Sequence, residues 1–182
     1  MTSSQPIDPT VEPWLRGPIP GVHPAIAPVL HSFIQVREDL ERHTAGLSTE
    51  QVWRRVGAVP ALGFQLRHLA GSVDRLVTYL RGDQLSEAQI ATLKNETKSE
   101  TKSEAEPGAS LDELLVGVRA ALDDAAARVR SLDPATLEQA RFVGKKRLPT
   151  TVIGLLVHVA EHTQRHLGQA ITTAKLVREA AD

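Results

Sequence analysis

The residues best suited to chemistry are histidines near the C-terminus, where three of the chain's seven fall at spacings of four. These are His158, His162 and His166. Residues four apart share one face of an α-helix, so a helix here would place the three imidazoles on one stripe. Neutral imidazole is a common ligand of divalent transition metals. Because the chain contains no cysteine, any metal must be held by His, Asp or Glu.

Helical geometry reduces the three histidines to a pair. On a wheel centred on Leu156, His166 lies about 80°, His162 about 120° and His158 about 160° from the inward direction. His158 and His166 are also about 12 Å apart along the axis, which is too far for both to ligate one ion at about 2.0–2.1 Å. We therefore predict that His162 and His166 face the interior and that His158 lies outside the site or hydrogen-bonds to it.

His68 is the best third ligand that the sequence offers. It lies one residue before the apolar stripe of a predicted helix over 62–81, where a side chain can be partly buried and still reach a cavity. Three neutral nitrogens would leave one position of the ion open, as in catalytic zinc sites. Spacing alone does not separate such a site from a histidine pair in a metal-free helix.

A competing motif overlaps the same stretch. His158 to His162 fits His-x-x-Glu-His, the inverted zinc-protease signature in which the glutamate, here Glu161, is the general base. That mechanism requires a further acidic ligand on another element, and only Glu179 and Asp182 follow the motif. We therefore favour the site with His68.

Apolar residues at spacings of three and four predict four long helices, and no segment alternates cleanly enough to predict a sheet. Patterns typical of capping boxes begin at Ser48, Ser86 and Ser110. These features predict an all-α protein in which residues 25–182 form one four-helix bundle domain. The helices are expected over about 25–45, 62–81, 110–132 and 151–178.

Two segments fall outside the bundle pattern. Seven of the 11 prolines lie at or before position 28, so residues 1–24 are predicted to form an extended arm, frayed at its start and anchored by Trp14. Residues 95–109 contain the unit Glu-Thr-Lys-Ser twice and no apolar residue within the repeat. We predict a mobile surface insertion there, with a solvated helical extension as the alternative.

Composition argues against several classes of partner. The net charge of −1 offers no broad attraction for nucleic acid. The sequence has neither an apolar run long enough to span a membrane nor an N-terminal signal pattern, so we expect a cytoplasmic protein with no membrane partner. Lys145, Lys146 and Arg147 could attract an anionic substrate to the mouth of a site, but we favour a solvated loop.

The chain resembles the DinB-like superfamily of bacterial four-helix-bundle metalloenzymes (DinB/YfiT type). Trp53 together with 63–70 is similar to the family's histidine motif on its second helix, and 161–169 is similar to its motif on the fourth helix. The match extends over roughly 25–178. The resemblance implies a divalent metal, zinc or nickel, on one histidine of helix two and two of helix four.

Those ligand positions correspond to His68, His162 and His166, with His158, Glu161, Gln164 and Gln169 as candidates to orient them through hydrogen bonds. The resemblance further implies a small-molecule substrate, a homodimer, and thiol-dependent transferase or isomerase activity with a low-molecular-weight thiol such as bacillithiol or mycothiol. A chain without cysteine must take its nucleophile from such a cosubstrate or from water. A metal-dependent hydrolase and a non-catalytic metal-binding or association bundle are the alternatives.

Overall fold

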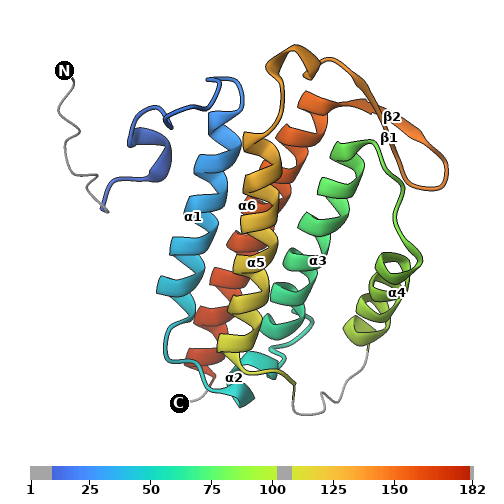
Figure 1. Ribbon diagram of the computed structural model, residues 1–182. Coiled ribbons are helices and arrows are strands. Elements are labelled where there is room, and N and C mark those ends of the chain that lie inside the picture. The colour runs from blue at the N-terminus through green and yellow to red at the C-terminus, as the bar shows by residue number, and fades with distance from the viewer. Residues whose placement is uncertain (1–9, 102–107, 181–182) are drawn as a thin grey trace.

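Four long helices form the body of the protein. The computed structural model describes residues 10–101 and 108–180, and in it α3 and α1 each pack against both α5 and α6 (Figure 1). The predicted all-α bundle is thereby confirmed. Its helices are α1 (Ala27–Thr44), α3 (Leu62–Arg81), α5 (Leu111–Arg130) and α6 (Val152–Glu179). The smaller elements are η1 (Pro13–Leu15), α2 (Thr49–Trp53), α4 (Glu87–Thr101), η2 (Pro134–Thr136), β1 (Ala140–Val143) and β2 (Leu148–Thr151).

The core is aliphatic, as the aromatic content of 3% requires. Each bundle helix directs a stripe of leucines, valines and alanines inward, and burying one leucine side chain contributes about 1.5–3 kcal/mol. These stripes hold the helices in one register. Among the most completely buried side chains are Leu30, Leu66, Leu69, Leu122 and Leu156.

The predicted helix starts have the expected capping geometry. Ser48 and Gln51 exchange backbone and side-chain hydrogen bonds, as do Ser110 and Glu113. Ser86 makes the same reciprocal pair with Gln89, with N···O distances of 3.0 and 3.2 Å. These bonds satisfy amide groups at the helix N-termini that have no partner within the helix.

Trp53 joins three parts of the bundle at one end. Its Nε1 donates to the carbonyl of Ala109 at 2.9 Å, and the Arg67 guanidinium lies 4.6 Å from the ring centroid. The ring also lies against the backbone of Gly63 and Gly108, where an added Cβ would overlap it. Trp53 therefore ties α2 to the start of α3 and to the chain entering α5.

The prediction that the chain contains no sheet was wrong. An antiparallel hairpin pairs β1 with β2, with Phe142 opposite Pro149. Its strands have only four residues each, too few for alternation to be recognised, and proline is uncommon in strand patterns. The turn requires positive φ at Gly144 (70°) and at Arg147 (51°). The hairpin ends at Thr151, whose side chain caps α6.

The described part of the arm, residues 10–24, consists of turns and the short helix η1, and Trp14 is not its anchor. Trp14 is 60% exposed. Arg16 holds the arm instead, because its guanidinium contacts both carboxylate oxygens of Glu38 on α1 at 2.6 and 2.7 Å and donates to the carbonyl of Val11. The predicted fraying of the first six residues lies outside the described part of the chain.

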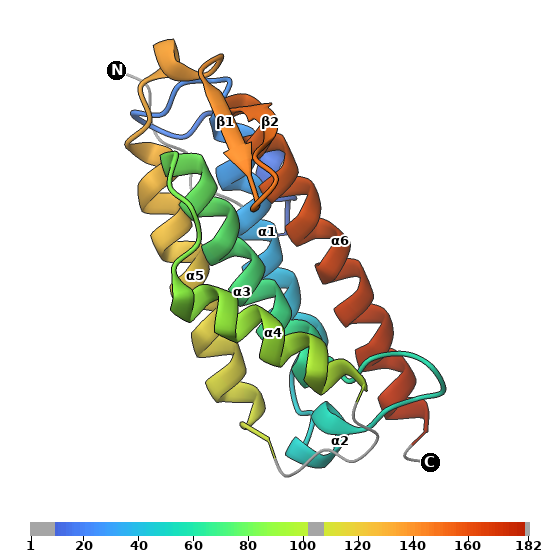
Figure 2. The ribbon, with the colours of Figure 1, turned by 90° about the vertical axis from the view of Figure 1, so that its right-hand side faces the viewer.

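The segment predicted as a mobile insertion is helical over residues 95–101, whereas residues 108 and 109 are not in a helix. Its first residues belong to α4, which ends at Thr101, so the alternative of a helical extension describes this part. Glu96 opens the polar repeat and is nevertheless buried. Residues 102–107 are outside the described part of the chain. In Figures 1 and 2, α4 runs along the outer side of α3.

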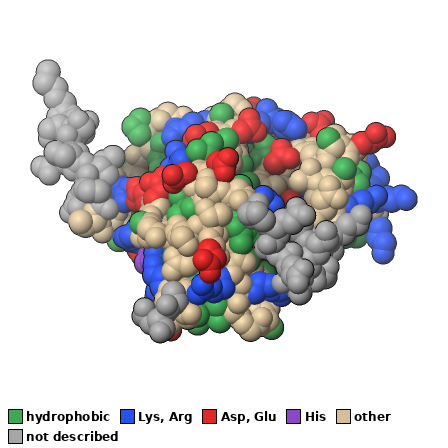
Figure 3. All heavy atoms as spheres, turned by 90° about the horizontal axis from the view of Figure 1, so that it is seen from below, with side chains coloured by type: hydrophobic (Ala, Val, Ile, Leu, Met, Phe, Trp, Pro, Cys, Tyr) green, Lys and Arg blue, Asp and Glu red, His purple; other side chains and the backbone are tan. Residues whose placement is uncertain are grey.

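The exterior is of mixed charge at the end of the bundle that carries α2. Seen from that end, acidic and basic side chains are interspersed, with no broad field of one sign (Figure 3). No helix in the described part of the chain is apolar over a length sufficient to cross a bilayer.

The Trp53 contact predicts opposite effects for two glycine substitutions. Gly63→Ala would place a Cβ 2.7 Å from the Trp53 ring, whereas a Cβ at Gly117 on α5 meets nothing within 4 Å. We expect Gly63→Ala to destabilise the fold by about 1–3 kcal/mol through overpacking. Gly117→Ala should stabilise it by up to about 1 kcal/mol through helix propensity. Urea unfolding measures the change in the free energy of unfolding for each variant. Equal changes in the two variants would contradict the contact between Gly63 and Trp53.

The Arg16–Glu38 pair predicts a pH-dependent contribution to stability. A hydrogen bond from Arg16 lowers the pKa of Glu38 below its usual 4.5, so the pair stabilises the fold above that pH and is lost as pH falls through the lowered value. Near neutrality the free energy of unfolding of the wild type should exceed that of Glu38→Gln by about 0.5–1 kcal/mol. This difference should vanish in acid. Glu41→Gln, which breaks the single contact to Arg119, is the control. A difference that persists in acid would exclude the charge pair as its cause.

Candidate metal centre

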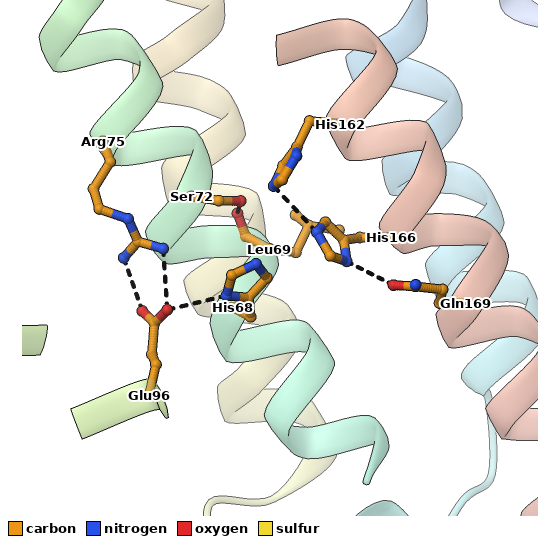
Figure 4. A network of polar contacts seen from close by, with 8 residues as sticks. All are labelled: His68, Leu69, Ser72, Arg75, Glu96, His162, His166 and Gln169. Carbon is orange, nitrogen blue, oxygen red and sulfur yellow. Dashed lines mark hydrogen bonds and ion pairs between the residues drawn. The ribbon is translucent and has the colours of Figure 1, made fainter. Parts of the chain in front are cut away.

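The three predicted histidines converge between α3 and α6. One ring nitrogen from each of His68, His162 and His166 lies within 4.8 Å of the other two. His162 Nε2 and His166 Nε2 are 3.1 Å apart, close to the roughly 3.3–3.4 Å between nitrogens on one tetrahedral zinc ion. Among the described residues these histidines form the one cluster of ligand-type side chains that could hold a metal ion (Figure 4).

Gln169 fixes the proton of His166. Nδ1 of His166 lies 2.8 Å from Oε1 of Gln169, an oxygen that can only accept a hydrogen bond. Nδ1 therefore carries the proton, and in the neutral ring Nε2 carries the lone pair. That nitrogen faces His162. Gln169 thus holds the ring with its other nitrogen toward the centre of the cluster.

Glu96 of α4 acts on His68 in the same way. Its Oε2 lies 3.1 Å from His68 Nδ1, and both its oxygens lie 3.0 Å from the guanidinium nitrogens of Arg75. Burial would raise the pKa of Glu96, but the hydrogen bonds from His68 and Arg75 outweigh it, and the pKa is lowered. The ionised carboxylate accepts a hydrogen bond from the N–H at Nδ1, and the other nitrogen of His68 faces the α6 pair (Figure 4).

His162 is an uncharged imidazole with one unsatisfied nitrogen. Burial, reinforced by His166, His158 and other neighbouring groups, lowers its pKa to about 4. Its Nδ1 is buried and has no hydrogen-bond partner among the described residues. Since His166 Nε2 carries a lone pair, only a proton on His162 Nε2 can join the two facing nitrogens. A cation among the three rings would replace that proton, so these donors fit a divalent metal.

A pocket opens beside the histidines. It has a volume of about 740 Å³ and lies between α3 and α6, with α4 and the loop before α3 as further walls. His68 and His166 both line it, so a molecule in the pocket would reach the ligand nitrogens. Its other lining residues are Ala58, Val59, Pro60, Phe64, Gln65, Leu93, Glu96, Gly168, Gln169, Thr172 and Thr173.

The other predicted partners of the ligands lie elsewhere. His158 is half exposed, with its ring centroid 5.4 Å from that of His162, and it is not part of the cluster of ligand nitrogens. Glu161 forms an ion pair with Arg165. Gln164 donates to the hydroxyl of Ser32 on α1 at 3.1 Å. This arrangement also argues against the inverted zinc-protease motif, because neither His158 nor Glu161 faces the centre.

Glu96 and Arg75 were missed at the level of sequence. Arg75 follows His68 by two helical turns, which places both on one side of α3 and was a usable signal. The sequence around Glu96 carries no such signal, because Glu96 begins a polar repeat with no apolar periodicity around it. Only the docking of α4 on α3 brings it to His68.

The basic run is remote from the centre. Lys145, Lys146 and Arg147 lie in the turn of the hairpin, and the Arg147 guanidinium lies 4.6 Å from the ring centroid of Phe142. None of the three lines the pocket. They are exposed, as the interpretation of a solvated loop predicts.

Comparison with known proteins agrees with this geometry. The sequence profile of the DinB superfamily matches residues 32–170, which is most of the chain and includes all three histidines of the centre. No curated protein matches the chain. The extent of the profile match shows that the chain belongs to the DinB superfamily.

Proposed function

We propose that this protein is a metal-dependent enzyme whose divalent ion, zinc or nickel, is held by His68, His162 and His166. The observation that carries the proposal is the approach of three imidazole nitrogens to within 4.8 Å at the edge of a large pocket. Hydrogen bonds to Gln169 and Glu96 support it, because they hold protons on the Nδ1 atoms of His166 and His68 and leave the facing nitrogens free.

The reaction that we propose is transfer of a low-molecular-weight thiol to an electrophilic small molecule, or a thiol-dependent isomerisation. Three neutral ligands leave a divalent ion's charge uncompensated, so the ion favours an anionic fourth ligand and lowers the pKa of a thiol. The chain's own part is to position and shield the reactants. Phe64, Val59 and Leu93 supply apolar pocket walls that limit access of water.

The thiol has to come from a cosubstrate, since the chain has no cysteine. Membership of the DinB superfamily and the volume of the pocket both support a small-molecule thiol as that cosubstrate. We further propose that the enzyme works in the cytoplasm as a homodimer.

The metal centre predicts a stoichiometric ion. After dialysis, the wild type should retain about one zinc or nickel ion per chain, and His162→Ala and His166→Ala should bind it more than about 100-fold more weakly, since loss of a ligand exceeds the 10–100-fold cost of losing its hydrogen-bond partner. His158→Ala, which removes a half-exposed histidine outside the cluster, should bind like the wild type. Elemental analysis and chelator competition measure both quantities. Equal trace metal in all four proteins would remove the basis for the enzyme.

The proposed reaction predicts dependence on added thiol. With the metal-loaded protein and a generic electrophile, the rate should rise with thiol concentration, and it should fall to background in His166→Ala. Loss of the electrophile and consumption of thiol are followed together. Hydrolysis of the electrophile at a rate that does not depend on thiol concentration would favour the hydrolase. No turnover with either nucleophile would favour the non-catalytic bundle.

A further inference from the structure

Helix α4 is docked on the bundle by polar contacts. Among its side chains that the structure describes, only Glu96 is buried, whereas Ile90 and Leu93 remain 40% and 36% exposed. Surface helices usually dock through an apolar stripe. Here α4 packs against α3 and has no comparable packing with the other bundle helices (Figure 2). Hydrogen bonds and ion pairs therefore contribute much of its attachment, beside the partial burial of Ile90 and Leu93.

Two groups of polar contacts hold α4 in place. Near its start, Nε2 of Gln89 donates to Asp74 at 2.8 Å and to Thr78 at 2.7 Å. Two turns later, Glu96 contacts Arg75 and His68. The second group differs from the first in one respect, because one of its members is a candidate metal ligand.

The backbone of α3 leaves room for the Glu96 carboxylate. Gly71 lies one helical turn after His68 and one before Arg75. A Cβ at Gly71 would overlap Oε1 of Glu96 and would lie 2.9 Å from Nη1 of Arg75. Any other residue at position 71 would force the ion pair to shift. One carboxylate fits the site formed by the space above Gly71, the guanidinium of Arg75 and Nδ1 of His68.

We propose that Glu96 is the positioning residue of His68, and that cation binding at the three histidines and docking of α4 are coupled through it. The proposal rests on the metal centre proposed above. The carboxylate holds the Nδ1 proton and so directs the other ring nitrogen to the centre, a role that strengthens a histidine ligand. A cation on that nitrogen polarises the ring and so strengthens the hydrogen bond from Nδ1 to Glu96. Coupling between two equilibria is reciprocal, so a bound cation stabilises the docked helix.

The coupling also acts on the pocket. Leu93 and Glu96 are the residues of α4 that line it. A cation that tightens the contact between Glu96 and His68 therefore holds one wall of the pocket in place. The metal-free protein should open this wall more readily than the loaded one, so loading of the centre favours the closed pocket.

The test uses two variants that displace the carboxylate by different means. Glu96→Gln removes its charge and keeps its shape. Gly71→Ala pushes it away while changing no polar group, and alanine favours the helix by about 1 kcal/mol. Glu87→Gln is the matched control, because Glu87 is an exposed carboxylate on the same helix. Circular dichroism checks that each variant folds.

Three readouts are made on the full chain. Chelator competition gives the Zn²⁺ affinity, hydrogen exchange with and without Zn²⁺ gives the protection of α4, and the ring ¹⁵N shifts of the metal-free protein give the tautomer of His68. In the wild type, Zn²⁺ should increase protection of α4, and His68 should carry its proton on Nδ1. Both variants should bind Zn²⁺ about 10–100-fold more weakly, lose the Zn²⁺-dependent protection and lose the fixed tautomer. Glu87→Gln should match the wild type.

Two results would overturn the proposal in different ways. Wild-type Zn²⁺ affinity and wild-type tautomer in both variants would reduce Glu96 to a structural contact while leaving the metal centre intact. A wild type that binds no Zn²⁺, nor Ni²⁺ in a parallel titration, would remove the metal centre and with it the coupling. The tautomer of His68, read without metal, would then still show whether Glu96 orients the ring.

Discussion

The packing of α3 against α6 sets the distance between His68 and the pair on α6. Each histidine adjoins a buried residue in sequence: Leu69 beside His68, Thr163 beside His162 and Leu167 beside His166. Protein interiors are close-packed, so one helix cannot slide past the other without opening voids or overlaps. The aliphatic core thus holds three rings from two helices close enough for their nitrogens to lie within 4.8 Å.

The position of the centre at the edge of that core explains its electrostatics. Burial disfavours charged imidazolium and lowers the pKa of both His162 and His166. The same burial leaves His162 Nδ1 without a hydrogen-bond partner among the described residues. On the side of the pocket, polar partners are present, including Gln65, which links the carbonyl of Pro60 to Thr173 on α6. Burial thus favours the neutral form of His162 and His166, while Gln169 and Glu96 on the polar side orient His166 and His68.

The sequence predicted those parts of the structure that repeat or lie close together along the chain. The 3.6-residue period located the bundle helices, and the spacing of His162 and His166 placed both on the side of α6 that faces α3. The hairpin was missed because four-residue strands carry too little pattern. The predicted anchor Trp14 is exposed, and Arg16 instead reaches a carboxylate on α1 that no local rule identifies. Gln169 lies one turn from His166, so a local pattern can suggest it as a partner, whereas nothing near Glu96 in the sequence points to His68.

Glu96 shows why a polar stretch is not necessarily an unattached one. A buried carboxylate loses its hydration, and in a folded protein only well-placed partners offset that loss. Arg75 and His68 are such partners, and both are positioned by α3 before α4 contributes anything. A helix docked by apolar burial would stay docked whatever the state of the histidines. The docking of α4 includes a hydrogen bond from His68 to Glu96, so it responds to what the His68 ring binds. The polar composition of α4 thus links the position of a surface helix to the occupancy of the centre beneath it.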